Sequence, residues 1–250
     1  MSRTSLKVEL LSHTPQPEEV IATGARLCYS SAGVEELIKG VAEKDQSKYL
    51  QRLVDMGHLS PIEHASFTFA IEGVSRALLA QITRHRIASF SVQSQRYVSQ
   101  AREEGCFPYI LPPAIEALGP EAVEAYDRQM RTMQQWYNEW QQKLGAKGEK
   151  SNEDARFVLP NACETRMVVT MNARELIHFF ELRCCNRAQW EIRALAWEML
   201  RLASQAAPLL FKNSGPGCIG GACPEGKMSC GKAEQVRKKR EALACKSKKQ

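Results

Sequence analysis

The sequence has no long hydrophobic run. No segment approaches the ~18 consecutive apolar residues that a membrane-spanning helix needs, and residues 1–19 lack the apolar centre of a secretory signal peptide. The phosphate-binding patterns G-x-G-x-x-G and G-x-x-x-x-G-K-[ST] are also absent. We therefore expect a cytoplasmic protein with no membrane partner, and we expect neither a Rossmann nor a P-loop nucleotide site.

The main part of the chain has no excess of charge of either sign. The formal net charge is +6, but residues 231–250 hold eight Lys or Arg against two Glu, whereas residues 1–230 carry 26 basic and 26 acidic side chains. A protein that binds nucleic acid over a wide surface usually has a broad basic field. We therefore expect no nucleic acid partner, and only the C-terminal segment is basic.

Paired cysteine motifs are missing as well. The nine cysteines are an odd number, and Cys184 and Cys185 are adjacent in a helix-like segment, where a disulfide is geometrically awkward. Reduced thiols are the simpler expectation. The C-terminal cysteines lack the C-x-x-C pairs of zinc ribbons, and the spacing of His58, Glu63 and His64 matches no helical two-histidine motif. We predict no metal site.

The residues that are present, 44% hydrophobic and 25% charged, predict a globular fold of mixed α and β structure. Hydrophobic periodicity predicts strands at 66–71 and 163–171 and helices at 15–30, 34–57, 75–86, 113–147 with a break at 119–120, 172–183 and, as the last helix, 188–206. The polar segment 86–100 is predicted to be a functional loop. Residues 1–210 form the predicted main domain, and residues 211–250 a Gly- and Cys-rich, then basic tail, which is either an appendage or flexible.

A dense basic cluster ends the predicted helix 75–86. Arg84, His85 and Arg86 precede a segment rich in Ser and Gln that also contains Arg96. Cations are common at helix C-termini, where the helix dipole is negative, so a solvated cluster is one interpretation. Three guanidiniums and an imidazole within thirteen residues, beside hydroxyls and amides, favour a phosphate or nucleotide site instead.

Arg183 occupies an unusual position on the helix that is predicted to begin with Asn172 as its capping residue. Leu176, Phe179, Phe180 and Arg183 are spaced i, i+3, i+4 and i+7, so the arginine lies on the apolar stripe. A buried guanidinium needs a carboxylate or an anionic ligand. A guanidinium that caps the helix end or reaches out to solvent is the alternative.

The basic cluster carries a family resemblance. Arg84-His85-Arg86, seven residues and then Ser94 resemble the RHR-x7-S signature of the flavin-dependent thymidylate synthases. Residues 58–64 resemble that family's H-x-[ST]-P-x-E-H element, and further similar elements follow in the family's order: Gln81, Arg156 with Val158-Leu159-Pro160, Asn172-Ala173-Arg174, and Leu182-Arg183. The resemblance covers residues 7 to 210.

The resemblance implies an α+β subunit with a twisted sheet flanked by helices, assembled as a homotetramer with shared sites. It implies synthesis of dTMP from dUMP, with 5,10-methylenetetrahydrofolate as the carbon donor. FAD would be the cofactor, NADPH would reduce it, and the reduced flavin would supply the hydride.

The resemblance also implies the site residues. Residues matching the dUMP site are Gln81, Ile82, Thr83, Arg84, Val92, Gln93, Ser94, Gln95, Arg96, Arg156 and Arg183. Residues matching the FAD site are Ser60, Arg84, His85, Arg86, Val92, Asn172, Ala173, Arg174 and His178. Arg183 would be the catalytic residue, because a guanidinium near the uracil stabilises negative charge on the ring and activates C5. No cysteine nucleophile would be required.

Two other functions compete with this interpretation. A nucleic-acid-binding module would use the arginine-rich segment and the basic tail together. The cysteine-dependent type of thymidylate synthase would need a reactive thiol, for which Cys163, Cys184 and Cys185 are the candidates.

Overall fold

The computed structural model describes residues 3–246, with side chains up to residue 243. The side chain of Cys245 and the basic residues Lys248 and Lys249 lie outside this range. The chain forms two compact units. Among the described residues, unit 1 comprises 3–7, 70–84 and 90–168, and unit 2 comprises 8–69, 85–89 and 169–246.

Four strands form one sheet in the order β1-β2-β4-β3. The strands are β1 (Lys7–His13), β2 (Ser66–Ser75), β3 (Ala88–Val92) and β4 (Glu164–Asn172). The sheet is antiparallel. The two ends of β2 show its register against β1, because the Thr14 amide donates to Ser66 O at 3.0 Å whereas Gly73 lies against Ser5. The predicted α+β class is confirmed.

The two edge strands differ from the sequence predictions. β1 was not predicted, and the loop predicted at 86–100 is wrong for residues 88–92, which form β3. Both are edge strands, and neither has a fully buried residue. An edge strand tolerates polar side chains because much of its surface faces water, so the Ser-rich composition of β3 does not conflict with strand structure. The predicted inner strands are confirmed as parts of β2 and β4.

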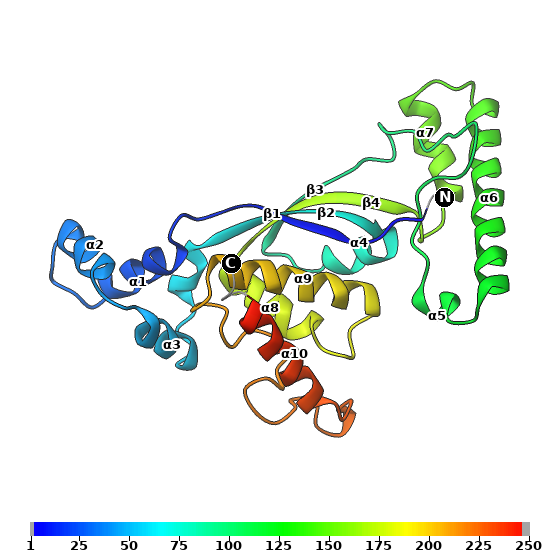
Figure 1. Ribbon diagram of the computed structural model, residues 1–250. Coiled ribbons are helices and arrows are strands. Elements are labelled where there is room, and N and C mark those ends of the chain that lie inside the picture. Colours follow the sequence, from blue (N-terminus) through cyan, green and yellow to red (C-terminus); the bar gives the residue numbers. More distant parts are fainter. Residues whose placement is uncertain (1–2, 247–250) are drawn as a thin grey trace. The chain divides into compact units, whose positions relative to one another are not determined.

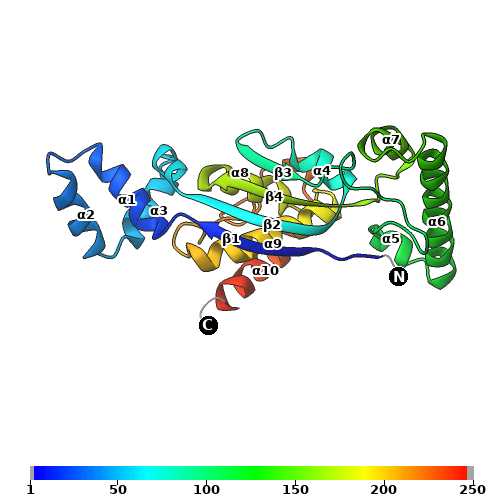
Figure 2. The ribbon, with the colours of Figure 1, turned by 90° about the horizontal axis from the view of Figure 1, so that it is seen from above.

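Unit 2 contains most of the helices. They are α1 (Pro17–Leu27), α2 (Val34–Ala42), α3 (Ser47–Asp55), η1 (Ser60–His64), α8 (Ala173–Arg183), α9 (Trp190–Ala206), η3 (Gly226–Met228) and α10 (Ala233–Lys246). Figures 1 and 2 show α1, α2 and α3 lying next to one another, and α8 beside α9. Within residues 3–246 no helix is long and apolar enough to cross a membrane.

The prediction of a single helix over residues 34–57 is wrong, because this segment forms two helices, α2 and α3. The buried side chain of Gln46 donates through Nε2 to Val41 O at 2.7 Å and to Lys44 O at 2.8 Å. These bonds satisfy carbonyls at the end of α2 that lack helical partners. The hydrophobic periodicity continues through this turn, so it did not indicate the turn that the Gln46 side chain stabilises.

The aromatic core of unit 2 connects β2 to α8. The ring of Phe67 from β2 packs edge-on against Phe211, with 5.3 Å between the ring centroids. Phe211 packs against Phe180 of α8 in the same way, with 5.8 Å between the centroids. All three side chains are fully buried. Edge-to-face aromatic packing of this kind fixes ring orientation. The apolar stripe predicted for 172–183 therefore faces the core, as its periodicity indicated.

The C-terminal segment is an ordered appendage of unit 2 as far as the structure describes it. The prediction that 188–206 is the last helix is wrong, because α10 follows (Figure 1). Arg240 of α10 is buried and donates to the carbonyls of Phe211 at 2.5 Å, Ser214 at 2.8 Å and Lys212 at 3.0 Å. Lys239 lies 4.3 Å from the ring centre of Trp197. Basic side chains of the predicted tail thus hold α10 in place.

Unit 1 contains α4 (Arg76–Ile82), α5 (Pro113–Glu116), α6 (Pro120–Lys143), α7 (Glu149–Ala155) and η2 (Arg156–Val158). The predicted break at 119–120 is confirmed, since Gly119 has φ +98° and Pro120 opens α6.

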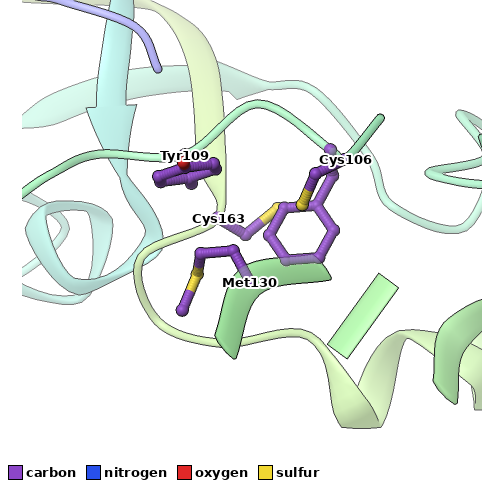
Figure 3. Close-up of a cluster of buried hydrophobic side chains, with 5 residues drawn as sticks. Cys106, Tyr109, Met130 and Cys163 are labelled. Carbon is purple, nitrogen blue, oxygen red and sulfur yellow. The ribbon is translucent and has the colours of Figure 1, made fainter. Parts of the chain in front are cut away.

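Unit 1 has a buried hydrophobic cluster of its own. Figure 3 shows the sulfur atoms of Cys106 and Cys163 turned into this cluster with Tyr109 and Met130. Burial raises the pKa of the Cys163 thiol to about 12.

Candidate active site

The sequence-predicted substrate residues of unit 1 begin at the end of α4. Ser75 caps this helix by accepting from the Leu78 amide at 3.0 Å, and α4 ends at Ile82. Ile82 is fully buried, so its side chain cannot reach a ligand. The Thr83 hydroxyl donates to Leu79 O at 2.9 Å, and Gln81 Nε2 reaches Ala77 O at 3.5 Å. The Gln81 and Thr83 side chains therefore donate hydrogen bonds to backbone carbonyls of α4.

The segment after β3 forms a turn stabilised by Ser94. Its hydroxyl accepts from the Arg96 amide at 3.2 Å, and its carbonyl accepts from the Val98 amide at 3.0 Å. The preceding Gln93 amide donates to Arg166 O at 2.9 Å, and Gln95 Nε2 lies 3.5 Å from Cys163 Sγ. The serine of the RHR-x7-S pattern thus shapes the backbone that carries Arg96.

Two arginines of the predicted dUMP site, Arg96 and Arg156, contact the same residue of helix α7, Glu153. Arg96 pairs with Glu149 and, at 3.2 Å, with Glu153, and its carbonyl accepts from Asn152 Nδ2 at 2.7 Å. Arg156 donates from Nε to Glu153 O at 3.1 Å. The Arg96, Glu149 and Glu153 side chains are all about 40% exposed, 42%, 42% and 41%. Water screens such pairs, so they can exchange partners at low cost.

In unit 2, His85 connects the start of α8 to its end. His85 Nδ1 lies 2.8 Å from Glu175 Oε1, and Arg183 Nε donates to His85 Nε2 at 3.1 Å. The rings of Phe179 and His178 pack edge-on against His85 at 4.9 and 5.9 Å. Only 4% of the His85 side chain and 7% of the Glu175 side chain are exposed. The predicted apolar position of Arg183 therefore has a neutral ring as a partner.

The protonation state of His85 follows from this geometry. A guanidinium can only donate, so the Nε2 that faces Arg183 must carry a lone pair. The imidazole is therefore neutral, with its proton on Nδ1, where Glu175 accepts it. Burial lowers the pKa of His85, and the nearby charge of Arg183 adds to this, while the hydrogen bond to Glu175 opposes it.

Sequence reasoning missed Glu175 as a member of this cluster. The prediction that Asn172 caps the helix is confirmed, because Asn172 Oδ1 accepts from the Glu175 amide at 2.9 Å. A capping box would return the Glu175 carboxylate to the Asn172 backbone. The carboxylate instead contacts His85, ninety positions away. An acidic residue directly before the apolar stripe was the only signal in the sequence.

The remaining sequence-predicted cofactor residues are mostly exposed. Arg174 pairs with Glu63 of η1 at 2.6 Å, and both side chains are exposed. Ser60, Arg84, Arg86 and His178 are exposed, whereas Ala173 is fully buried and its amide donates to Ala65 O at 2.8 Å. Among the described residues, the side chains of Arg84 and Arg86 have no protein hydrogen bond or ion pair.

Comparison with known proteins gives the family. A family model described as "Thymidylate synthase complementing protein" matches residues 9–209. The flavin-dependent thymidylate synthase of Clostridium tetani is 53% identical over 93% of this chain and 96% of its own length. Those of Geobacter sulfurreducens and Thermococcus onnurineus are 52% and 41% identical, over 93% and 90% of this chain and 97% and 92% of their own lengths.

The chain belongs to the flavin-dependent thymidylate synthase family. The resemblance inferred from the RHR-x7-S pattern is thereby confirmed. The alignments that cover 93% of the chain leave 7% of 250 residues unmatched, fewer than the forty residues of 211–250. The similarity to these family members therefore extends into the C-terminal segment.

The C-terminal segment of this family member lines a cavity of about 450 Å³ at the end of α8. Arg183 and Cys185 line it from the α8 side, and Cys218, Cys223 and Glu225 from the appendage. Arg187 pairs with Glu225 there. No group of three or more metal-binding side chains occurs among the residues that the structure describes. The predicted catalytic arginine therefore borders a cavity that has the appendage as one wall.

Two of the three candidate cysteine nucleophiles are poorly suited to that role. Cys163 and Cys184 are fully buried. Burial raises the pKa of both thiols, that of Cys163 to about 12, so neither forms a thiolate readily near neutral pH. Cys185 is half-buried and borders the cavity.

Proposed function

We propose that this chain converts dUMP to dTMP with a hydride from reduced flavin. The names of its relatives, flavin-dependent thymidylate synthases, support thymidylate synthesis and flavin dependence. 5,10-Methylenetetrahydrofolate would donate the carbon, and NADPH would reduce the FAD. The observation that carries the proposal is 53% identity to a flavin-dependent thymidylate synthase over 93% of the chain, with the RHR-x7-S pattern intact.

The dUMP phosphate would be bound in unit 1 by Arg96 and Arg156. Both guanidiniums adjoin Glu153, and a phosphate would replace the exposed carboxylates as the partner of Arg96. Charge-assisted hydrogen bonds from arginine to phosphate are stronger than an exposed ion pair. Ser94, Gln93 and Gln95 would contribute to the same site through the turn that they form.

Arg183 would polarise the uracil. Its Nε donates to His85, and the residue lines the cavity at the end of α8. Planar N–H donors suit the O2 carbonyl of uracil, and also N3 once that nitrogen has lost its proton. Stabilising negative charge on N3 and O2 makes C5 more nucleophilic, and C5 is the carbon that accepts the methylene. No thiol need attack the ring.

The residues proposed for FAD fit an anionic, aromatic group. Arg84 and Arg86 expose guanidiniums without protein partners among the described residues, and Arg174 lies at the positive N-terminal end of α8. These cations would hold the phosphates, with Asn172 and Ser60 contributing polar contacts. When bound, the reduced flavin supplies the hydride, and positive charge around it favours its anionic reduced form.

The assembly would be a homotetramer with shared sites, in the cytoplasm. Trp136 and Trp140 lie four residues apart on α6 and are 48% and 47% exposed, and Phe157 is 83% exposed. Exposed aromatic side chains of this kind mark interaction surfaces. Equilibrium sedimentation tests this part: a mass near four times 28.1 kDa supports it, and a monomer contradicts it.

The visible spectrum of the purified protein, combined with product analysis, tests the reaction. A flavin absorption band, dUMP-stimulated NADPH oxidation and dTMP formation are expected together. The single variants Cys163→Ala, Cys184→Ala and Cys185→Ala separate the flavin mechanism from the thiol mechanism. Continued dTMP formation by each single cysteine variant is expected, and loss of turnover in Cys185→Ala with flavin retained would support the thiol mechanism instead.

A further inference from the structure

Three groups of unit 2 form one continuous hydrogen-bonded path. It runs from the carboxylate of Glu175 through the ring of His85 to the guanidinium of Arg183, with contacts of 2.8 and 3.1 Å. Glu175 stands at the start of α8 and Arg183 at its end, so the imidazole spans two turns of that helix. The resemblance assigned roles to His85 and Arg183 but none to Glu175.

Only one arrangement of protons satisfies this path. Arg183 Nε donates, so His85 Nε2 accepts, and the ring proton must be on Nδ1. Nδ1–H then donates to Glu175, which as a carboxylate can only accept. The carboxylate thus selects the tautomer that leaves Nε2 free to accept from Arg183. A ring with its proton on Nε2 would direct an N–H at the guanidinium and lose the contact.

Burial makes this selection strong. Glu175 and His85 are almost entirely buried, so water cannot replace a lost partner. The titratable or charged groups that face His85 are Glu175, Arg183 and His178, and Phe179 closes the side of the ring. Since both ring nitrogens are held, the imidazole cannot rotate without breaking a buried hydrogen bond.

We propose that Glu175 is a positioning residue for Arg183: acting through His85, it holds the guanidinium in the orientation that polarises the uracil. This proposal rests on the proposed function, because it presupposes that Arg183 contacts the substrate. Misplacing a catalytic group by about 1 Å costs on the order of 100-fold in rate. A residue that touches neither substrate nor flavin can therefore control turnover.

Two substitutions of Glu175 separate positioning from general stability. Glu175→Leu removes the acceptor, and we expect kcat to fall about 10- to 100-fold while flavin and dUMP affinities change less than about 3-fold. Glu175→Gln keeps an acceptor oxygen, and most of the activity should return. Glu164→Gln is the matched control, since Glu164 is a buried carboxylate of unit 1 that accepts from the Gly73 amide at 3.0 Å.

The pH profile provides a readout that a merely structural role would not move. The hydrogen bond to the carboxylate raises the pKa of His85 against the effect of burial. Glu175→Gln removes that charge, so His85 stays neutral to lower pH, and the acidic limb of kcat should shift to lower pH. An unchanged limb, or equal losses in Glu175→Leu and Glu164→Gln, would overturn the proposal.

Nitrogen-15 NMR of the flavin-loaded protein tests the path without any turnover. Histidine-labelled protein has five imidazoles, and His85→Gln identifies the signal of His85. We expect a neutral ring with its proton on Nδ1 in the wild type and a mixture of tautomers in Glu175→Leu. A protonated ring at pH 7 or a proton on Nε2 would overturn the proposal. If the wild type formed no dTMP, the proposed function would fail while this measurement still reported on Glu175.

Discussion

Arg96 and Arg183, the two arginines proposed to contact the substrate, have opposite surroundings. Arg96 in unit 1 is 42% exposed and pairs with two exposed carboxylates. Arg183 in unit 2 contacts a neutral imidazole that is 4% exposed and is itself held by a buried carboxylate. An exposed pair is worth about 0–1 kcal/mol and exchanges readily, whereas a buried network holds its geometry.

The difference suits two different tasks. A phosphate site must release its protein partners when substrate binds, so weakly held carboxylates are adequate. A group that stabilises charge during the reaction must already be oriented, because reorganisation at that moment costs rate. Under the proposed function, the arrangement would separate an exchangeable arginine for binding from a fixed arginine for catalysis.

Arg183→Lys gives the largest expected effect. A lysine keeps the charge but loses the planar N–H pair and the Nε donor to His85. We expect kcat for dTMP formation to fall about 100- to 1000-fold, with little change in flavin content. Steady-state assays of this variant beside Arg201→Lys, a control on α9 that pairs with Glu198, measure it. If only KM changed, Arg183 would act in substrate binding, as proposed for Arg96, and not in catalysis.

Arg96→Ala should act on binding rather than on the chemical step. Loss of charge-assisted hydrogen bonds to a phosphate costs about 1.5–3 kcal/mol, so KM for dUMP should rise roughly 10- to 100-fold. The free energy of unfolding should change by less than about 1 kcal/mol, since the pairs lost are exposed. Kinetics and urea unfolding on the same preparation check both. A fall in kcat at saturating dUMP would contradict the assignment.

The stability of the protein should depend on pH through His85. The folded-state pKa is lowered below the ordinary value of 6.5, so the unfolded chain binds the proton more readily. Between pH 6.5 and the folded-state pKa, the free energy of unfolding should fall by about 1.4 kcal/mol for each unit of decreasing pH. Urea unfolding of the wild type and His85→Gln compares the slopes. The same slope in both would show that other groups cause it.

The smallest expected effect comes from Glu149→Gln. Removing one carboxylate that competes with the phosphate for Arg96 should lower KM for dUMP about 2- to 5-fold, because the exposed pair is worth less than about 1 kcal/mol. Glu124→Gln is the control, as Glu124 pairs with Arg128 on α6 in the same unit. A higher KM would mean that the carboxylate positions Arg96 for the substrate.

The sequence predicted local features of the site well. The spacing of Leu176, Phe179 and Arg183 placed the arginine on the core-facing stripe, and Asn172 capped the helix as expected. Both features depend on residues within one or two turns. The partner of Arg183 could not be predicted, because His85 is 98 positions away and no local pattern links them.

The failures of prediction have the same origin. The strand β3 resembled a loop because its edge position tolerates Ser, and that position is set by a pairing with β4 more than seventy residues later. α10 was not predicted because only Val236 and Arg240 are buried among its described side chains, and the partners of Arg240 are backbone carbonyls of 211–214. Contacts between distant segments decided each case.

Single-turnover formation of dTMP, with the flavin reduced beforehand and dUMP and 5,10-methylenetetrahydrofolate bound, tests the catalytic role proposed for Arg183. The wild type should convert bound dUMP to dTMP, and Arg183→Ala should do so at least about 100-fold more slowly while binding flavin and dUMP normally. Equal single-turnover rates in the two proteins would contradict the role assigned to Arg183.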